Sequence, residues 1–558
     1  MSDQRPRWSR RLTWLAPVPV VIALAAVPAS GASSAPSPAA AALTRVSSPV
    51  VQRYLLAHPD EASGERGHMD AARAALAAAR STQSHSSSTS STSQGPGDLL
   101  RFNRDDLGLP QNEESVGSCA GPSGDVVLGG TNDYRGLVNP SGNFTGWYLS
   151  RNGGRSVSNE GLLPTVRSGS TQVPSGGDPV DVATPSCDLY AASLNYPVAL
   201  DFSNVPANTN GATVYRTTPQ RLASCQGGDS PDCWPNRRFV ARNRAGHFID
   251  KEWMYVGRSG SAGNVVWVTY TDFDMTAHNP AGFTASIHAV RCDAALRSCT
   301  APITISGSDA DVQFSDVTVG PDGRTYITWA QIKGELTGRP QSFIFKMRVA
   351  PAGSTSFGPT RVIYREDNAI PFGGVLHANT FRIATYPKNT VSMVGGRPRV
   401  WLVWDACGTR VLDSVCENAR IKLRWSDDGG ASWSPIHQVS SSGENYFPTI
   451  DSDPQNGKVA VAYYTSRYDP VFHNRQDVEL TTVDNQGSVT KRARLTPFSN
   501  ETEADPLLGA FFIGDYFEVD ARRGSAYVHF NANYTSVPLL GTGSPIPQQD
   551  NFLTRAGM

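Results

Sequence analysis

The sequence predicts an all-β fold assembled from repeated antiparallel units, and three observations support this prediction. The chain has 558 residues, which is long for one compact domain unless that domain is a repeat structure. Its 51 Gly and 39 Pro favour short strands joined by turns over long helices. From residue 99 onward one pattern returns: an apolar strand, a turn at Gly, Asn or Asp, and a second alternating strand.

These repeats indicate a β-propeller, because radial packing of short sheets hides most strand edges. Weaker copies of the pattern begin near Asp125 and Asp181, which brings the number of units to seven. We expect six or seven blades, since a degenerate outer unit could merely close a six-bladed ring. A stacked β-solenoid is less favoured because the repeats are long and vary in length. The clearest copies span residues 251–273, 314–332, 381–407, 447–469 and 513–534.

The N-terminus is typical of a secreted protein. A basic stretch that begins at Arg5 is followed by the apolar run 12–27 and by the small residues Ser30 and Ala32. The run is short for a membrane-spanning helix and contains two prolines, so cleavage is favoured over an uncleaved anchor. We predict a signal peptide over 1–32 and export of the mature chain.

The segment 33–98 is predicted to be a leader and linker ahead of the propeller. It is rich in Ala, Ser, Thr and Pro, and it contains a short helix-prone stretch, DAARAALAAAR, before the Ser/Thr-rich residues 81–97. A pro-segment is the alternative to a simple spacer. The propeller itself is expected to occupy residues 99–558.

The eight cysteines agree with export, since their number is even and six of them form close sequence pairs. No C-x-x-C pair or Cys/His cluster has zinc-binding spacing. We therefore predict four disulfides: Cys119–Cys187, Cys225–Cys233, Cys292–Cys299 and Cys407–Cys416.

The charge of the chain bounds its partners. The net charge is −1 at pH 7, which provides no electrostatic argument for nucleic acid or an anionic membrane. No second apolar segment approaches membrane length, so no stable membrane insertion is expected after cleavage. We expect a monomer.

The octet SDDGGASW at 426–433 resembles the Asp-box, S-x-D-x-G-x-[ST]-W, of the sialidase and BNR-repeat families. A degenerate copy, SRNGGRSV, stands at 150–157. The resemblance covers roughly residues 100–558 and implies a sialidase-like propeller in which each motif closes a turn between outer strands. The matching residues are Ser426, Asp428, Gly430, Ser432 and Trp433.

The chemistry of this motif favours a structural role. An Asp side chain can accept hydrogen bonds from turn N–H groups, glycines provide positive φ, and a Trp covers the apolar layer. A structural calcium ion at Asp427 and Asp428 is the alternative; otherwise no cofactor is expected.

The resemblance also implies a set of catalytic groups: a Tyr nucleophile with a Glu, an Asp acid/base, and three Arg that bind the sugar carboxylate. The family's first Arg lies in an F-R-I-P motif. Arg382 lies in F-R-I-A, far along the chain, so its match is favoured as a coincidence. The other two Arg cannot be assigned.

Polar residues at the starts of innermost strands are the remaining candidates for a site. Tyr516 and Glu518 in GDYFE share a strand face and could form a nucleophile pair beside Asp515. A buried Tyr in the core between blades explains Tyr516 equally well. Asp250 and Glu252 in DKEW could form an acid/base pair, or an ion-pair belt with the intervening Lys.

Two functions follow. The first is a secreted, sialidase-like glycoside hydrolase that acts on an extracellular glycan through Tyr516, Glu518, Asp250, Glu252, Arg382 and Asp515. The second is a non-catalytic propeller that binds glycan or protein, as the missing F-R-I-P motif favours. Whether the chain is an enzyme is left open by the sequence.

Overall fold

The computed structural model describes residues 99–196, 209–279, 281–337, 339–411, 414–508, 512–541 and 544–558. The predicted signal peptide and leader lie outside the described residues. Within the described residues the chain forms seven four-stranded antiparallel sheets, and the main helix, α5 (Pro219–Ser224), is short. No helix in the described part of the chain is long and apolar enough to cross a membrane.

Each of the first four sheets is built from strands consecutive within it, from the innermost outward. The first three sheets are β2 (Gln111–Gly121), β3 (Gly124–Asp133), β4 (Thr145–Ser150) and β5 (Asn159–Leu162); then β8 (Ser175–Ala183), β9 (Leu189–Asn195), β10 (Gly211–Thr217) and β11 (Asn236–Arg242); then β12 (His247–Arg258), β13 (Asn264–Asp274), β14 (Thr284–Asp293) and β15 (Ile303–Thr304). The fourth is β16 (Val312–Val319), β17 (Thr325–Lys333), β18 (Ser342–Ala350) and β19 (Arg361–Glu366).

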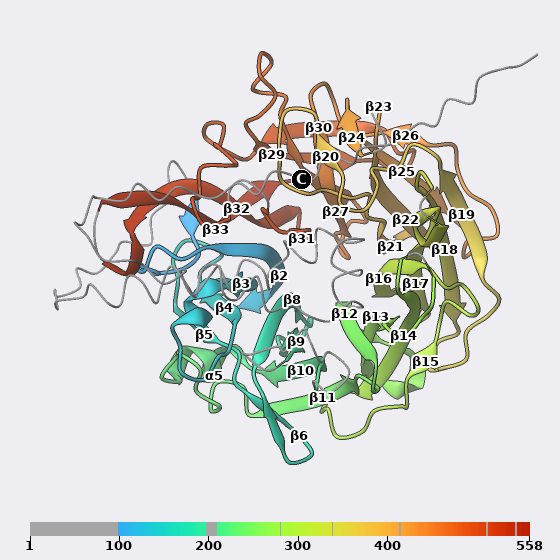
Figure 1. Ribbon diagram of the computed structural model, residues 1–558. Coiled ribbons are helices and arrows are strands. Elements are labelled where there is room, and N and C mark those ends of the chain that lie inside the picture. The colour runs from blue at the N-terminus through green and yellow to red at the C-terminus, as the bar shows by residue number, and fades with distance from the viewer. Residues whose placement is uncertain are drawn as a thin grey trace, which may run out of the picture.

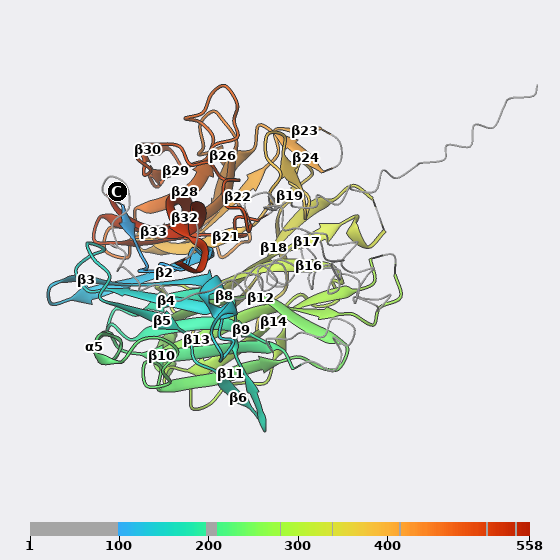
Figure 2. The same ribbon diagram turned by 60° about the vertical axis from the view of Figure 1, so that its left-hand side comes forward.

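The remaining three sheets complete the circle. They are β21 (Lys388–Val394), β22 (Arg397–Ala406), β25 (Arg420–Ser426) and β26 (His437–Gln438); then β27 (Asn445–Ser452), β28 (Val459–Thr465), β29 (Asp477–Val483) and β30 (Val489–Arg494); then β31 (Glu518–Arg522), β32 (Ser525–Pro538), β33 (Pro545–Gly557) and β1 (Leu100–Arg101). A hairpin of β6 (Val166–Ser168) and β7 (Thr171–Val173) projects from the second sheet (Figures 1 and 2). Strands β20 (Val375–Leu376), β23 (Thr409–Val411) and β24 (Val415–Glu417) form a small accessory sheet.

The innermost strands form a closed ring. They contact one another in the order β2, β8, β12, β16, β21, β27 and β31, and β31 returns to β2. Figure 1 shows these strands around one central axis, with the other strands of each sheet farther out. The predicted β-propeller is confirmed, and the number of blades is seven.

The ring is closed by joining the two ends of the propeller in one blade. Strand β1 pairs with β33, which places Leu100 opposite Leu553 and Arg101 opposite Phe552. The guanidinium of Arg101 also forms a buried ion pair with Asp550, whose side chain is 0% exposed. The seventh blade therefore takes its outermost strand from the beginning of the propeller and its other strands from the end.

Five innermost strands carry the same irregularity near their beginnings. In each, two residues are skipped in the pairing with the second strand, and the first of these has positive φ. Such bulges redirect side chains, and here they aim several at the axis. In the remaining two blades, Tyr386 and Tyr516 stand two residues before Lys388 and Glu518, where the innermost strands begin. The positive-φ residues are Glu113, Asp178, Lys251, Phe314 and Phe447.

Carboxylates on the innermost strands connect neighbouring blades. Asp316 accepts a hydrogen bond from the main-chain N–H of Asn389 at 2.6 Å, and Asp451 accepts one from that of Ala521 at 2.8 Å. Each bond satisfies a main-chain donor at the inner edge of a sheet, where no further strand can pair with it. This explains why the innermost strands alternate polar with apolar residues.

The four predicted disulfides are all formed. Cys119–Cys187 joins β2 to the turn after β8, and so connects two blades, with a sequence separation of 68. The other three, Cys225–Cys233, Cys292–Cys299 and Cys407–Cys416, close short loops. Disulfides at this density are typical of proteins that mature in an oxidising compartment.

The 426–433 turn lies between β25 and β26, the two outer strands of its blade, as the motif predicts. Asp428 Oδ1 accepts from the N–H groups of Ala431 and Ser432 at 2.8 and 2.9 Å, while Gly429 and Gly430 have φ of 68° and 90°. Burial raises the pKa of Asp428, but hydrogen bonds, with that from the Ser432 hydroxyl the largest, lower it to about 2. Every one of these contacts is local to the turn.

The degenerate copy between β4 and β5 repeats this geometry. Asn152 Oδ1 accepts from the N–H groups of Arg155 and Ser156, each at 3.1 Å, and the Ser150 hydroxyl accepts from Gly154 N–H at 3.0 Å. Asn therefore replaces the Asp as an acceptor without changing the shape of the turn.

Candidate functional site

A group of charged residues closes the end of the propeller axis at which the innermost strands begin. We call this group the axial knot, and its members are Glu113, Asp178, Lys251, Arg382 and Asp515. Lys251 Nζ forms an ion pair with Asp515 and lies 3.9 Å from Asp178 and 4.0 Å from Glu113. Arg382 donates two hydrogen bonds to Asp515, at 2.9 and 2.7 Å. Residues from three innermost strands and from the two segments that precede β21 and β31 thus meet at the axis.

The axial knot keeps Asp515 ionised. Burial raises the pKa of Asp515, but Arg382 and Lys251 more than compensate and lower it to about 2. The Asp515 N–H also donates to Glu113 Oε1 at 3.0 Å, so main chain and side chains are held together. A buried ion network with this many partners resists opening, because removing any one member leaves an unpaired buried charge.

Tyr516 lies beside the axial knot and is 9% exposed. Its hydroxyl donates to the carbonyl of Pro179, in the bulge of β8, at 3.0 Å, and its ring packs edge-to-face on Trp253 at 5.3 Å. Burial, and then the charge of Glu113, raise the pKa of this phenol well above its usual value. The hydroxyl is therefore protonated and bound to the main chain rather than to Glu518.

Glu252 faces a small cavity of about 30 Å³ that it shares with Tyr516, Trp253 and Lys388. The side chain is 2% exposed, and neither carboxyl oxygen has a hydrogen-bond partner. Burial, reinforced by the charge of Asp178, raises its pKa well above the usual range. The raised pKa favours the neutral form of Glu252, and the cavity beside it has room for a water molecule.

A second, larger cavity of about 630 Å³ runs along the axis, on the side of the small cavity that faces away from the axial knot. Trp253 and Lys388 line both cavities and so mark the boundary between them. The far end is lined by exposed turn residues, including Pro185, Pro321 and Gln455, and therefore opens to solvent. We call this space the axial cavity; it is closed at the knot and open at the opposite face.

Five carboxyls with a raised pKa line the axial cavity: Asp181, Asp316, Asp451, Glu518 and Asp520. Two of them, Glu518 and Asp316, interact with Lys388 and differ in their proton affinity. Burial raises the pKa of Glu518 to about 8, against the opposing charge of Lys388. Burial raises the pKa of Asp316 less, to about 6, again opposed by Lys388. At neutral pH the first is mostly protonated and the second mostly ionised, which is the relation expected of an acid and a base acting together.

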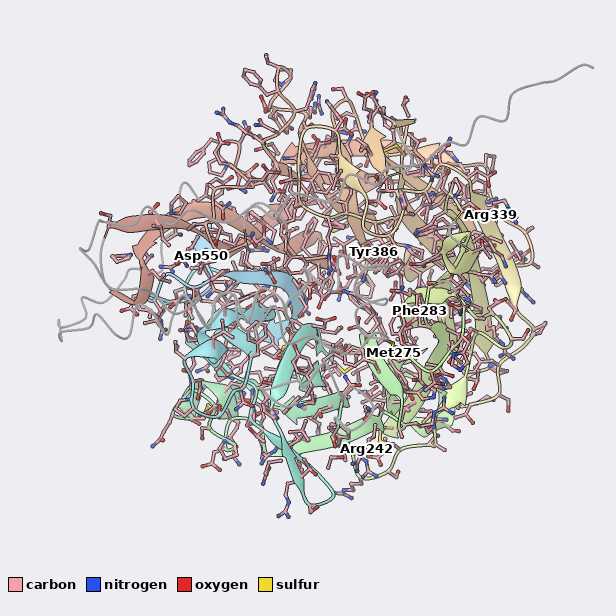
Figure 3. The ribbon with its side chains drawn as sticks, in the orientation of Figure 1. Arg242, Met275, Phe283, Arg339, Tyr386 and Asp550 are labelled. Carbon is pink, nitrogen blue, oxygen red and sulfur yellow. A yellow bond between two sulfur atoms is a disulfide. The ribbon has the colours of Figure 1, made fainter. Side chains whose placement is uncertain are left out.

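The six residues predicted as catalytic lie close to one another but not in one cavity. Glu518 lines the axial cavity, Tyr516 and Glu252 line the small cavity, and Asp515 and Arg382 belong to the axial knot. Asp250 lies in β12 opposite Thr271 and acts on Glu252 through its charge. Figure 3 shows Tyr386, another neighbour of the knot, beside the axis, with Arg242 and Arg339 near the periphery.

Three cavity-wall residues at this site were not among the candidates from the sequence: Trp253, Asp316 and Lys388. Lys251 was expected only as part of an ion-pair belt with its sequence neighbours, and it instead pairs with Asp515 at the centre of the axial knot. One signal could have found the lysines. The chain has only seven Lys among its 49 basic residues, and two of them stand at the start of innermost strands. Among the described residues, no group of three or more His, Cys, Asp or Glu is arranged to hold a metal ion.

The fold and site define a seven-bladed propeller with a blind, polar axial cavity. No family model matches the chain, and no curated protein matches it. Among solved structures it is similar to Hadza microbial sialidase Hz136, at 12% identity and a TM-score of 0.41, over 74% of this chain and 73% of that chain.

Two further structures are similar at the same distant level. One is the α-L-arabinofuranosidase Arb93A from Fusarium graminearum, with 10% identity, a TM-score of 0.39 and coverage of 82% of this chain and 98% of that chain. The other is a family PL25 ulvan lyase, with 7% identity, a TM-score of 0.46 and coverage of 82% and 96%. At these scores no activity transfers to this chain, and its own sheet topology defines the fold.

Proposed function

We propose that the protein is a secreted carbohydrate-active propeller that hydrolyses an extracellular glycan bound in the axial cavity. The observation that carries the proposal is the placement of Glu518 and Asp316, an acid and a base at neutral pH, in one cavity that Trp253 also lines. Glycoside hydrolysis requires such a pair of carboxyls. A cavity closed at one end suits removal of a terminal sugar.

In this proposal Glu518 protonates the departing oxygen and Asp316 activates water or attacks the sugar. Tyr516, Glu252 and Asp250 shape the closed end, and Arg382 with Asp515 seals it. The sialidase-like variant, in which Tyr516 is the nucleophile, requires its hydroxyl to leave the Pro179 carbonyl. The two-carboxyl and sialidase-like mechanisms therefore differ in whether turnover requires the hydroxyl oxygen of Tyr516.

Hydrolysis of a panel of labelled extracellular glycans tests the proposal. Glu518→Gln should lower kcat by roughly 100-fold or more on whichever glycan is cleaved, as loss of a general acid does. Tyr516→Phe should leave kcat within a few fold in the two-carboxyl variant and abolish turnover in the sialidase-like one. Undiminished turnover by Glu518→Gln and Asp316→Asn together would exclude the axial cavity as the catalytic site.

A second function, glycan binding without catalysis, is favoured by the state of the axial knot. Arg382 already donates from Nε and Nη2 to the two oxygens of Asp515, so this side of its guanidinium is not available to a sugar carboxylate. Saturable binding of a glycan by wild type, with no product after prolonged incubation, would support this function.

Export of the mature chain is part of the proposal and is supported by the four disulfides. N-terminal sequencing of protein from the culture medium should start close to residue 33. Retention of the intact N-terminus in the cell fraction would contradict export.

A further inference from the structure

Lys388 is a buried lysine that forms neither a close ion pair nor a hydrogen bond with any side chain in the described part of the chain. It is 9% exposed, and its ammonium lies 2.8 Å from the centroid of the Trp253 ring and 5.5 Å from that of Tyr516. Among the described residues, no carboxylate oxygen lies within 4.0 Å of it and no atom accepts a hydrogen bond from it. By contrast, Lys346 pairs with Asp309 at 2.6 Å and Lys422 with Glu366 at 2.8 Å.

The surroundings of Lys388 weaken its hold on the proton. Burial lowers its pKa to about 8, although Asp316 from β16 and Glu518 from β31 act in the opposite direction. The positive charge of Lys251, from β12, lowers it further, and the aromatic residues Trp253 and Tyr516 complete the surroundings. Near neutral pH a substantial fraction of the side chain is therefore the free amine, which is the nucleophilic form.

Lys388 is also reachable. It lines the axial cavity of about 630 Å³, whose open end is bordered by exposed residues such as Pro321 and Gln455. The walls near it carry hydroxyls and amides, including those of Thr318, Asn389 and Thr390. Such walls suit a small polyhydroxylated ligand better than an apolar one.

We propose that Lys388 is a reactive amine that captures small aldehydes, foremost the open-chain form of a reducing sugar, as a reversible imine in the axial cavity. The inference stands on the unpartnered amine and its cavity, and it holds whether or not the protein hydrolyses glycans. It adds a carbonyl-binding activity to the proposed hydrolytic one.

The chemistry balances without an oxidant or reductant. The lone pair of Nζ forms a bond to the carbonyl carbon, and the proton that the nitrogen then releases passes to the carbonyl oxygen, which produces a neutral carbinolamine. Glu518, in the same cavity, donates a proton to the hydroxyl as it leaves as water, and the proton on nitrogen returns to the Glu518 carboxylate. The net reaction converts one amine and one aldehyde into one imine and one water, and hydrolysis reverses it.

Reductive trapping tests the proposal on the intact mature protein. The protein is incubated with D-glyceraldehyde and cyanoborohydride from pH 6 to 9, and modification of each of the seven lysines is followed by peptide mass spectrometry. Lys388 should react at least about tenfold faster than the exposed Lys333, because a lysine of ordinary pKa holds far less free amine. Its rate should rise with a midpoint near pH 8, the pKa that burial sets.

Two variants test whether Lys388 is the fast-reacting residue, and a second aldehyde tests whether the cavity prefers sugars. Lys388→Arg, checked for an unchanged melting temperature, should lose the fast-reacting site, whereas Lys333→Arg should keep it. Propanal, which has no hydroxyls, should be trapped more slowly than glyceraldehyde. Equal rates at Lys388 and Lys333 would overturn the reactive amine, and equal rates with both aldehydes would overturn the assignment to sugars.

Discussion

At the scale of single residues, Glu518 shows how the axis changes the chemistry of an ordinary carboxyl. Its side chain accepts a long main-chain hydrogen bond, from Val116 N–H at 3.3 Å, which does not offset the loss of water around it. The pKa consequently rises to about 8. A carboxyl that is neutral at pH 7 can donate a proton, and the same shift makes folding stability depend on pH.

The pH dependence of stability follows from this shift. Glu518 binds its proton more tightly in the folded than in the unfolded state, so its stabilising contribution is present below the unfolded pKa, about 4.5, and is lost as pH rises toward 8. Glu518→Gln removes this effect. Between pH 5 and 8 the melting temperature of wild type should therefore fall relative to that of Glu518→Gln, as differential scanning calorimetry would measure. Parallel curves for the two proteins would contradict the raised pKa.

Sequence reasoning reached part of the site at this scale. Tyr516, Glu252 and Glu518 were found because polar groups at strand starts stand out against apolar neighbours. Lys388 and Asp316 were missed because their significance depends on Trp253 and Glu518, which come from other blades. Contacts between residues so far apart in the chain leave no local pattern to detect.

At the scale of elements, the 426–433 turn has a structural role, whereas the bulges of the innermost strands contribute to the candidate functional site. The turn was predictable because the hydrogen bonds that shape it join residues within a few positions of one another. Arg361 and Arg399 add contacts to it from outside the turn. The bulges were not, since their paired residues differ in every blade: Glu113 with Glu114, Lys251 with Glu252, and Phe447 with Pro448. Only the three-dimensional register shows that these pairs are equivalent.

Asp428→Ala should destabilise the protein without reducing glycan binding. The substitution removes the acceptor of several turn N–H and hydroxyl groups, and the exposed site limits the cost to about 1–2 kcal/mol of unfolding free energy. Urea unfolding followed by fluorescence measures the change. Asp367→Ala, at a side chain that is 74% exposed, is the matched control and should be neutral. Loss of glycan binding by a folded Asp428→Ala protein would show that the turn has a direct role.

At the scale of the whole molecule, closure of the ring depends on a two-residue strand. Propeller architecture and the disulfides could be predicted from repeats and cysteine spacing, but the number of blades could not. The reason is that β1 is too short to be recognised as a strand, yet it completes the seventh blade and covers the edge of β33. Closure of the ring depends on strands from both ends of the propeller, so neither end of the sequence predicts it alone.

Two N-terminal truncations separate closure from the leader. Removal of residues 1–98 leaves β1 in place and should leave the melting temperature unchanged. Removal of residues 1–101 also deletes the partner of the buried Asp550 and uncovers a strand edge, so it should cost about 3–5 kcal/mol and promote aggregation. Thermal unfolding with light scattering distinguishes the two, and equal behaviour would mean that β1 does not close the ring.

The central claim is that the axial cavity, rather than any turn on the rim, recognises glycan. The most direct measurement is the affinity of Trp253→Ala and Trp433→Ala, both verified as folded, for the tightest glycan found on an array. The account predicts that Trp253→Ala loses at least about tenfold in affinity, roughly 1.4 kcal/mol, while Trp433→Ala binds as wild type does. Unchanged binding by Trp253→Ala, together with loss of binding by Trp433→Ala, would contradict it.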